Sequence, residues 1–347
     1  MGVVIVMRNI YDFTLKELEN YFVSIGDKKF RAVQIYDFLY KKHVDDPFMM
    51  NNIGKKMQEY LKDHFDFYRI RFILKQEDKD VAKYLFEMND GERIETVLMY
   101  HDYGLSVCVS SQVGCNMGCK FCESGRLKKV RNLVAYEMIQ QILFIEKDIG
   151  RRITHVVVMG IGEPMDNYDN VMRFIRILNE PKGIALGSRH ITVSTCGLVP
   201  GIERFMNEEG QVNLAISLHA PNDEIRRKIM PIACVYPLSD LMNVVKKYIE
   251  KTNRRVTMEY IMLDSINDMD SCAIELSHLL QGINCYVNLI PYNETENISF
   301  KRSKNGQIMR FYDILKKNNI GVTVRREFGG KVDAACGQLR ANQKGGM

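Results

Sequence analysis

Residues 110–125 read SSQVGCNMGCKFCESG and hold Cys115, Cys119 and Cys122 in the spacing C-x3-C-x2-C. Structural zinc sites usually close with four ligands arranged as two pairs, and no matching pair follows downstream. A four-iron cluster normally takes four thiolates, so three would leave one iron open to a small molecule. The spacing therefore predicts an iron–sulfur cluster with an open iron; a zinc site and three free thiols are the alternatives.

Short apolar runs alternate with amphipathic helical stretches from about Leu105 onward. The runs read LSVCVSS, THVVVMGIG, RHITVSTCG, QVNLAISLH, RVTMEYIML, CYVNLIPYN and IGVTVRRE. Near-continuous apolar strands between helices indicate a parallel sheet covered by helices. Six or seven such units predict an α/β fold of the partial (β/α)6-barrel type rather than a doubly wound sheet. In a barrel the chemistry lies in loops that follow the strands, which is where the cysteine stretch falls.

The first ~95 residues have a different, helical pattern. Three helical segments begin at FTLKELENYF, KKFRAVQIYD and IGKKMQEYLK, and Thr14 with Glu17 forms a capping box for the first. Strand-like segments with a turn at Asn89-Asp90-Gly91 follow. We expect residues 1–95 to form a small N-terminal helical accessory domain plus a connecting hairpin, and residues 96–347 to form the catalytic barrel.

Composition limits the cellular setting and the partners. Nine cysteines without a recognisable secretory signal indicate a reducing, cytoplasmic location. No apolar run approaches the length of a membrane helix. The net charge of +5 permits an RNA partner without requiring one. We expect a monomer with no membrane association.

Six segments together resemble one protein family. CVSSQVGCNMGCKFC, GIGEPMDN, RHITVSTCG, LAISLHAPND, VNLIPYN and DAACGQLR occur in order over residues 95–340. They are similar to the RlmN/Cfr family of radical S-adenosylmethionine (SAM) RNA methyltransferases, and more so to its RlmN branch. The resemblance implies an enzyme with a [4Fe–4S] cluster, SAM and an external electron donor. The implied substrate is 23S rRNA, and tRNA as a further one.

Site residues follow from the same resemblance, position by position. The cluster ligands would be Cys115, Cys119 and Cys122. The SAM contacts would be Gly162, Glu163, Ser194, Ser217, Leu218, His219 and Asn293.

Two further cysteines would shape the reaction. C2 of adenine is electron-poor, so it cannot attack a methyl donor directly. The family mechanism implies that the Cys336 thiolate takes a methyl group from one SAM, and that a second SAM turns it into a carbon radical that adds to C2. Glu95 would remove the C2 proton. Cys108 would then attack the Cys336 sulfur, release 2-methyladenine and leave a disulfide for cellular thiols to reduce.

Several alternatives stay open. One is methylation of C8 of the same rRNA adenine, as in the Cfr branch, and another is a radical SAM maturase acting on protein. Glu123 departs from the small residue that follows the third cysteine in the family, which suggests a divergent paralogue with another RNA target. A carboxylate there would lower the cluster's reduction potential. The non-enzyme alternative is an RNA-binding protein with a zinc site.

Basic segments are candidate phosphate contacts. RLKKVRN follows the cysteine stretch directly. The other candidates are Arg189, Arg325, Arg326, Lys28, Lys29, Arg31, Lys41 and Lys42.

Overall fold

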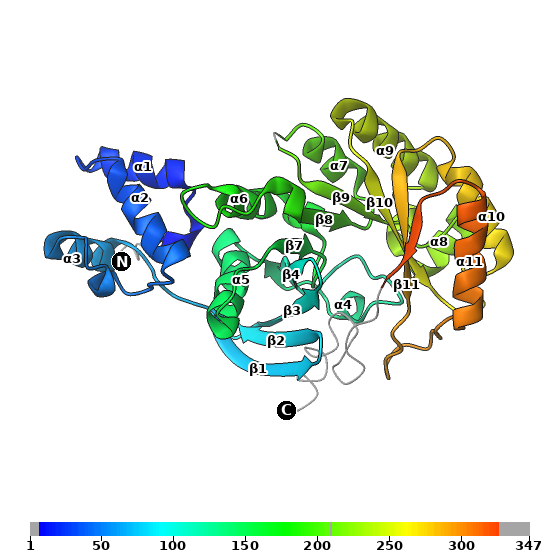
Figure 1. The fold of residues 1–347 in the computed structure, drawn as a ribbon, viewed down its shortest axis with the longest axis horizontal. Coiled ribbons are helices and arrows are strands. Elements are labelled where there is room, and N and C mark those ends of the chain that lie inside the picture. Colours follow the sequence, from blue (N-terminus) through cyan, green and yellow to red (C-terminus); the bar gives the residue numbers. More distant parts are fainter. Residues whose placement is uncertain (1–6, 209, 326–347) are drawn as a thin grey trace, which may run out of the picture.

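The computed structural model describes residues 7–208 and 210–325 (Figure 1). One ten-stranded sheet runs in the order β1-β2-β3-β4-β7-β8-β9-β10-β11-β12. Its strands are β1 (Arg71–Asp78), β2 (Val81–Glu87), β3 (Arg93–His101), β4 (Gly104–Cys108), β7 (His155–Val158), β8 (Ile191–Thr195), β9 (Asn213–Ser217), β10 (Val256–Met262), β11 (Cys285–Pro291) and β12 (Val322–Val324). A separate two-stranded ladder pairs β5 (Gln112–Val113) with β6 (Arg131–Asn132).

The sheet changes character at β4. From β4 to β12 every neighbouring pair is parallel, whereas β1, β2, β3 and β4 pair antiparallel. The charge of Arg325, directly after β12, acts on the thiol of Cys108 at the end of β4, although the two strands lie at opposite ends of the parallel run. The sheet therefore curves into a partial barrel, as the apolar runs predicted.

Helices cover the outside of this curved sheet (Figure 1). Those of the barrel are α4 (Glu123–Arg126), α5 (Ala135–Ile149), α6 (Tyr168–Asn179), α7 (Val199–Phe205), α8 (Asp223–Ile229), α9 (Leu238–Thr252), α10 (Asp270–Leu280) and α11 (Asn305–Lys317). The apolar faces of the longer helices pack on one face of the strands, where alternate strand residues such as Val256, Met258 and Tyr260 of β10 join the core. Within the described ranges every helix is too short or too polar to cross a membrane.

The N-terminal helices form a separate lobe beside the barrel (Figure 1). They are α1 (Leu15–Ser24), α2 (Phe30–Tyr36) and α3 (Lys55–His64), and α2 continues as a π-helical turn over Asp37–Lys41. The predicted capping box is confirmed, because Thr14 accepts from the Glu17 N–H and the Glu17 carboxylate accepts from the Thr14 N–H. Arg173 of α6 binds the same carboxylate at 2.5 Å and joins the lobe to the barrel.

The hairpin of β1, β2 and β3 extends the barrel sheet. The sheet crosses the proposed boundary at residue 95, since β3 spans Arg93–His101. The division into residues 1–95 and 96–347 stays a prediction.

One buried glutamine fixes the end of β4. Gln141 of α5 accepts from the Ser110 N–H (2.9 Å) and from the Thr96 hydroxyl (2.7 Å), and it donates to the Ser110 carbonyl (3.1 Å). A side chain thus satisfies both backbone groups of a buried residue that has left the strand ladder. Ser110 begins the cysteine stretch, so this contact sets where that stretch starts.

Replacing Gln141 by Leu should lower the free energy of unfolding by about 3 kcal/mol, because buried polar groups at Ser110 and Thr96 lose their partner. Urea unfolding of the apoprotein measures this change. The matched control is Lys147→Ala at an exposed position of the same helix, which should stay within about 0.5 kcal/mol of the parent. Equal stability of Gln141→Leu and the parent would contradict the role given to this contact.

Candidate active site

The cysteine stretch forms a tight loop after β4. The Cys115 N–H donates to the Leu127 carbonyl (2.8 Å), and the Lys120 N–H donates to Ile229 at the end of α8 (2.9 Å). A side chain on Gly114, which has φ +78°, would lie 2.1 Å from the carbonyl oxygen of Lys128. Only glycine lets the two ends of the loop approach so closely.

The loop brings its three thiols together. Burial raises the pKa of each thiol, that of Cys115 to about 12. The charge of Cys122 raises the pKa of both Cys115 and Cys119 further, and the charge of Cys115 does the same to Cys119. Three neighbouring buried thiolates are unfavourable unless a positive centre neutralises them. The donor set therefore fits an iron–sulfur cluster held by the three predicted ligands.

A single metal ion is a different case. In the part of the chain that the structure describes, no group of three or more His, Cys, Asp or Glu side chains is arranged to hold one. Each cysteine of this part is a free thiol. Cys336, predicted to carry the methyl group, lies outside the described residues, so its disulfide with Cys108 stays a prediction.

Gly162 and Glu163 form a rigid turn after β7. Gly162 has φ +112°, and a Cβ there would lie 2.6 Å from Cβ of Gln112. The buried Glu163 carboxylate accepts from the N–H groups of Met165 (3.0 Å) and Cys196 (2.8 Å), and burial raises its pKa. The turn thus places a buried carboxylate beside the cysteine loop. A carboxylate in this position can bind an ammonium group.

The other predicted SAM contacts also follow parallel strands. Ser194 lies in β8 beside Ala215 of β9, and Ser217 ends β9 beside Glu259 of β10. The N–H groups of Leu218 and His219 both donate to the Glu259 carbonyl (3.1 and 3.2 Å). These residues share one edge of the barrel with the Glu163 turn.

Asn293 follows β11 and is exposed. Among the described residues, no hydrogen bond joins it to the other predicted SAM residues. Its role as a SAM contact stays a prediction.

Arg226 of α8 is fully buried in the site, and the sequence analysis did not identify it. Its guanidinium donates to the carbonyls of Cys196 (2.7 Å) and Leu218 (3.2 Å), and its charge lowers the pKa of Cys119. It therefore fixes two strand-end segments and places a positive charge near a cluster thiol. In the sequence this arginine is one of several cations on a short amphipathic helix, and no local signal distinguishes it.

Glu123, the residue that departs from the family, is also buried. One carboxylate oxygen binds Arg126 at 3.1 Å, and the other has no partner among the described residues. The charge next to Cys122 is thus partly balanced by Arg126. The predicted effect of Glu123 on the cluster potential stays a prediction.

A second set of polar side chains occupies the barrel interior. Desolvation raises the pKa of Cys108 to about 11, against the opposing charges of Arg325 and Lys83. Glu95 is buried and forms an ion pair with Lys83 at 3.5 Å. The structure thus brings Glu95 and Cys108, two of the three predicted catalytic residues, close enough for the charge of one to act on the other.

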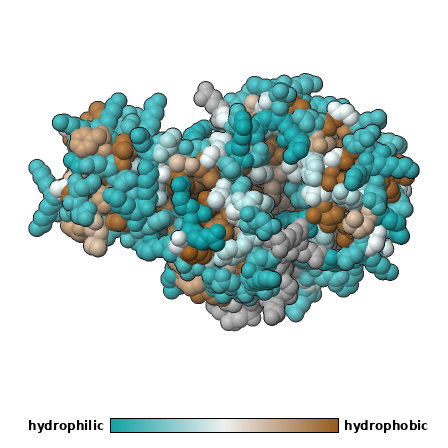
Figure 2. Space-filling view, in the orientation of Figure 1, coloured by the Kyte–Doolittle hydropathy of each residue, from teal (hydrophilic) through white to brown (hydrophobic). Residues whose placement is uncertain are grey.

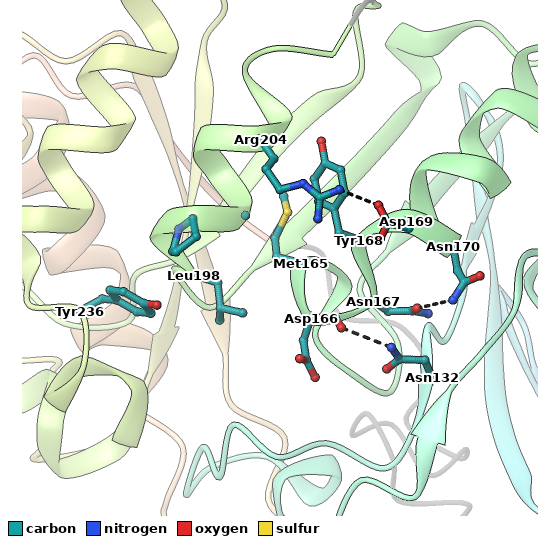
Figure 3. A pocket seen from close by; sticks show the side chains of 12 residues that line it. Asn132, Met165, Asp166, Asn167, Tyr168, Asp169, Asn170, Leu198, Arg204 and Tyr236 are labelled. Atoms are coloured by element: carbon teal, nitrogen blue, oxygen red, sulfur yellow. Dashed lines mark hydrogen bonds and ion pairs between the residues drawn. The ribbon is translucent and has the colours of Figure 1, made fainter.

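A polar pocket of about 300 Å³ lies outside this edge of the barrel (Figure 3). Leu198 and Tyr236 lie on one side and Asp166 with Asn132 on the other. None of the predicted SAM contacts lines it, although Met165 and Asp166 follow Glu163 closely in the chain. On the face shown in Figure 2, hydrophilic residues cover most of the surface and hydrophobic ones form scattered patches between them.

A network of side chains ties the loop to the turn. Asp166 binds Lys129 at 2.7 Å and accepts from Gln112 at 2.9 Å, and Gln112 also donates to Asn132 at 2.8 Å. Gln112 accepts from the Glu163 N–H at 2.8 Å. Hydrogen bonds and one ion pair therefore connect the loop that carries the thiols to the turn that carries Glu163.

His219 is neutral and takes part in the packing of the cysteine loop. Its Nδ1 accepts from the Ile261 N–H at 3.0 Å, which leaves the proton on Nε2, and its ring meets Phe121 edge-on at 4.9 Å. Burial, and then the charge of Arg226, lower its pKa from 6.5 to about 3. The residue has φ +59°, a conformation that asparagine also tolerates.

The stability contributed by neutral His219 should be complete above pH 6.5 and should fall below it, because the unfolded chain takes up a proton that the folded chain excludes. The difference in unfolding free energy between the parent and His219→Asn should shrink by about 1.4 kcal/mol per pH unit between pH 6 and pH 4.5. Urea unfolding across this range measures it, with His278→Asn on α10 as the control for loss of an exposed histidine. A difference that is independent of pH would refute this assignment.

Comparisons with known proteins agree with this geometry. Residues 109–273 match the model of the radical SAM superfamily, and residues 8–66 match that of the ribosomal RNA large subunit methyltransferase N-terminal domain. A probable dual-specificity RNA methyltransferase RlmN of Enterococcus faecalis is 51% identical, with 97% of each chain covered. The protein of the same name from Spiroplasma citri is 48% identical, covering 98% of this chain and 99% of its own.

A solved structure shows the same fold over nearly the whole length. The crystal structure of a radical SAM methyltransferase from Sphaerobacter thermophilus superimposes with a TM-score of 0.91 at 41% identity, covering 95% of this chain and 98% of that one. These matches argue against the alternative of a non-catalytic RNA-binding protein with a zinc site. The chain belongs to the RlmN family of radical SAM RNA methyltransferases, which use a [4Fe–4S] cluster and SAM.

Proposed function

We propose that this enzyme forms 2-methyladenine in 23S rRNA and in the anticodon loop of tRNA, through a methylated Cys336. The observation that carries the proposal is the position of Cys108 at the end of β4, beside the buried Glu95 and seven residues before the first cluster ligand. A maturase acting on protein offers no reason for this pair. The relatives named as dual-specificity RNA methyltransferases support two RNA substrates.

The protein's own residues divide the work. Cys115, Cys119 and Cys122 would hold the cluster, and Glu163 would bind the ammonium group of SAM. When bound, the cluster and SAM supply the one-electron chemistry that activates the methyl group.

The catalytic residues would act on the covalent adduct between RNA and protein. Glu95 would take the C2 proton of the adenine that Cys336 has captured. Cys108 would attack the Cys336 sulfur and form a disulfide; the bond from that sulfur to the methylene carbon breaks, and its electron pair leaves with the released methylated base. The raised pKa of Cys108 keeps most of this thiol protonated until that step, which limits premature oxidation.

The product base identifies the reaction. Anaerobically purified, reconstituted enzyme should convert 23S rRNA and tRNA from a strain lacking this activity to RNA that contains 2-methyladenine, detected by mass spectrometry of nucleosides. Cys336→Ala should abolish the product, because the methyl carrier is lost, whereas Cys234→Ala at an exposed position should not. Detection of 8-methyladenine instead would favour the alternative reaction, and no methylated base in either RNA would contradict the proposal.

Phosphate contacts by the segment after the cluster loop can be tested separately from the methylation reaction. Lys129 is already paired with Asp166 at 2.7 Å, whereas Lys128 is exposed. Lys128→Glu should weaken RNA binding about threefold or more and reduce the slope of log affinity against log salt by about one. Lys246→Glu on the outer face of α9 changes the net charge equally and should leave the slope unchanged. Identical slopes for the two variants would exclude this contact.

A further inference from the structure

Lys83 of β2 is a buried lysine to which the sequence assigns no role. Its side chain is 2% exposed, and its Nζ lies 3.5 Å from Oε2 of Glu95, whose side chain is 3% exposed. Lysine is almost never buried unless it is paired, because removing an ammonium group from water is costly. A buried ion pair adds little net stability. Its presence inside a catalytic barrel therefore suggests a role in the reaction.

The strand register places this pair near Cys108. Lys83 lies opposite Val97 of β3, and Val97 lies opposite Cys108 of β4. The three residues form one row across the sheet, so Lys83 and Cys108 point to the same face with their Cα atoms about 10 Å apart. Glu95 lies two residues before Val97 and therefore also points to this face.

The surroundings of the row are apolar. Val81, Val97, Met99 and Val157 pack together with Cys108. A carboxylic acid in such a place becomes neutral at pH 7 unless a cation lies next to it, because desolvation penalises the charged form. A neutral acid cannot accept a proton, so a base at Glu95 requires a fixed neighbouring cation.

Charged groups from other strands also face this interior. Burial raises the pKa of Cys108 and of Glu259 of β10, and the positive charge of Arg325, after β12, opposes this rise in both. The Glu259 carboxylate also accepts from the Asn288 amide at 2.8 Å. Lys83 forms an ion pair with Glu95, and its charge also lowers the pKa of Cys108.

We propose that Lys83 is a positioning residue for RNA methylation, which keeps the Glu95 carboxylate ionised and on the Cys108 side of the barrel. The proposal rests on the proposed function of Glu95 as the base. The C2 proton passes to a carboxylate oxygen of Glu95, the electron pair of the broken C–H bond stays on the adenine adduct, and Lys83 keeps its own protons. Glu95 is then neutral beside an ammonium group that still faces Cys108.

The test compares Lys83→Met with Lys83→Arg in the full-length, reconstituted enzyme under single-turnover conditions. Lys83→Met should form methylated RNA about 100-fold more slowly at pH 7, the scale of a lost general base. Its rate should rise about tenfold per pH unit above pH 7, because a carboxyl group without its cation ionises only at higher pH. Lys83→Arg retains the charge and should recover most of the rate with the parent pH profile.

Two further readouts separate this role from a structural one. Methylation of Cys336, measured by peptide mass, precedes the base step and should be unchanged in Lys83→Met, while the RNA–protein adduct should accumulate. Lys75→Met removes an ion-paired lysine from neighbouring β1, where it binds Glu77 and Asp148, and should leave the rate and its pH profile unchanged. If Lys83→Met does not fold, Lys83→Gln is measured in the same way.

The outcomes distinguish the role of Lys83 from the role of Glu95. Parent-like rate and pH profile in Lys83→Met, together with an inactive Glu95→Gln that accumulates adduct, would overturn the role of Lys83 and leave the base in place. An active Glu95→Gln would overturn both. Loss of Cys336 methylation in a folded Lys83→Met would also overturn the proposal, because it would place Lys83 before the base step.

Discussion

The site depends on confining three cysteine thiols within a few residues of one another in a poorly hydrated place. As free thiols they hold their protons firmly, since burial and mutual repulsion both oppose ionisation. A positively charged iron–sulfur centre reverses this balance, so the same burial that makes the apo loop unreactive favours loading of the cluster. The surrounding architecture holds the loop still while this happens. Gln141 fixes its entry and Arg226 fixes the segments that pack against it.

The barrel interior follows a different rule from a fully closed β/α barrel, whose centre is filled by apolar side chains. Here the parallel strands stop short of closure, and polar side chains line the inner face. Lys83 pairs with Glu95, and Arg325 lies near Glu259. Buried charges in such a space are stabilised by opposite charges nearby instead of by hydration. The interior can therefore accommodate proton transfer on a nucleic-acid base, which an apolar core could not.

Local patterns in the sequence predicted much of this structure. The capping box at Thr14, the parallel strands and the position of polar loops after them all depend on residues close together in the chain. The cluster loop was recognisable for the same reason, because its three ligands fall within eight residues. The roles of Cys336 and Asn293 rest on resemblance alone.

Features that depend on distant residues were not visible in the sequence. The continuation of the barrel sheet into β1, β2 and β3 is one, since a hairpin carries no mark of the edge it will join. Arg226 and Lys83 are two more: each becomes informative only when its burial and partners are known. Sequence patterns describe which face of an element is apolar, but they do not reveal a single cation hidden on that face.

The link from Lys129 through Asp166 and Gln112 to the backbone of Glu163 has a mechanical consequence. The thiol loop and the carboxylate turn are held by one rigid bracket instead of two independent supports. Thermal displacement of either part is passed to the other, so the spacing between the iron ligands and the donor-binding carboxylate fluctuates less than either segment does alone.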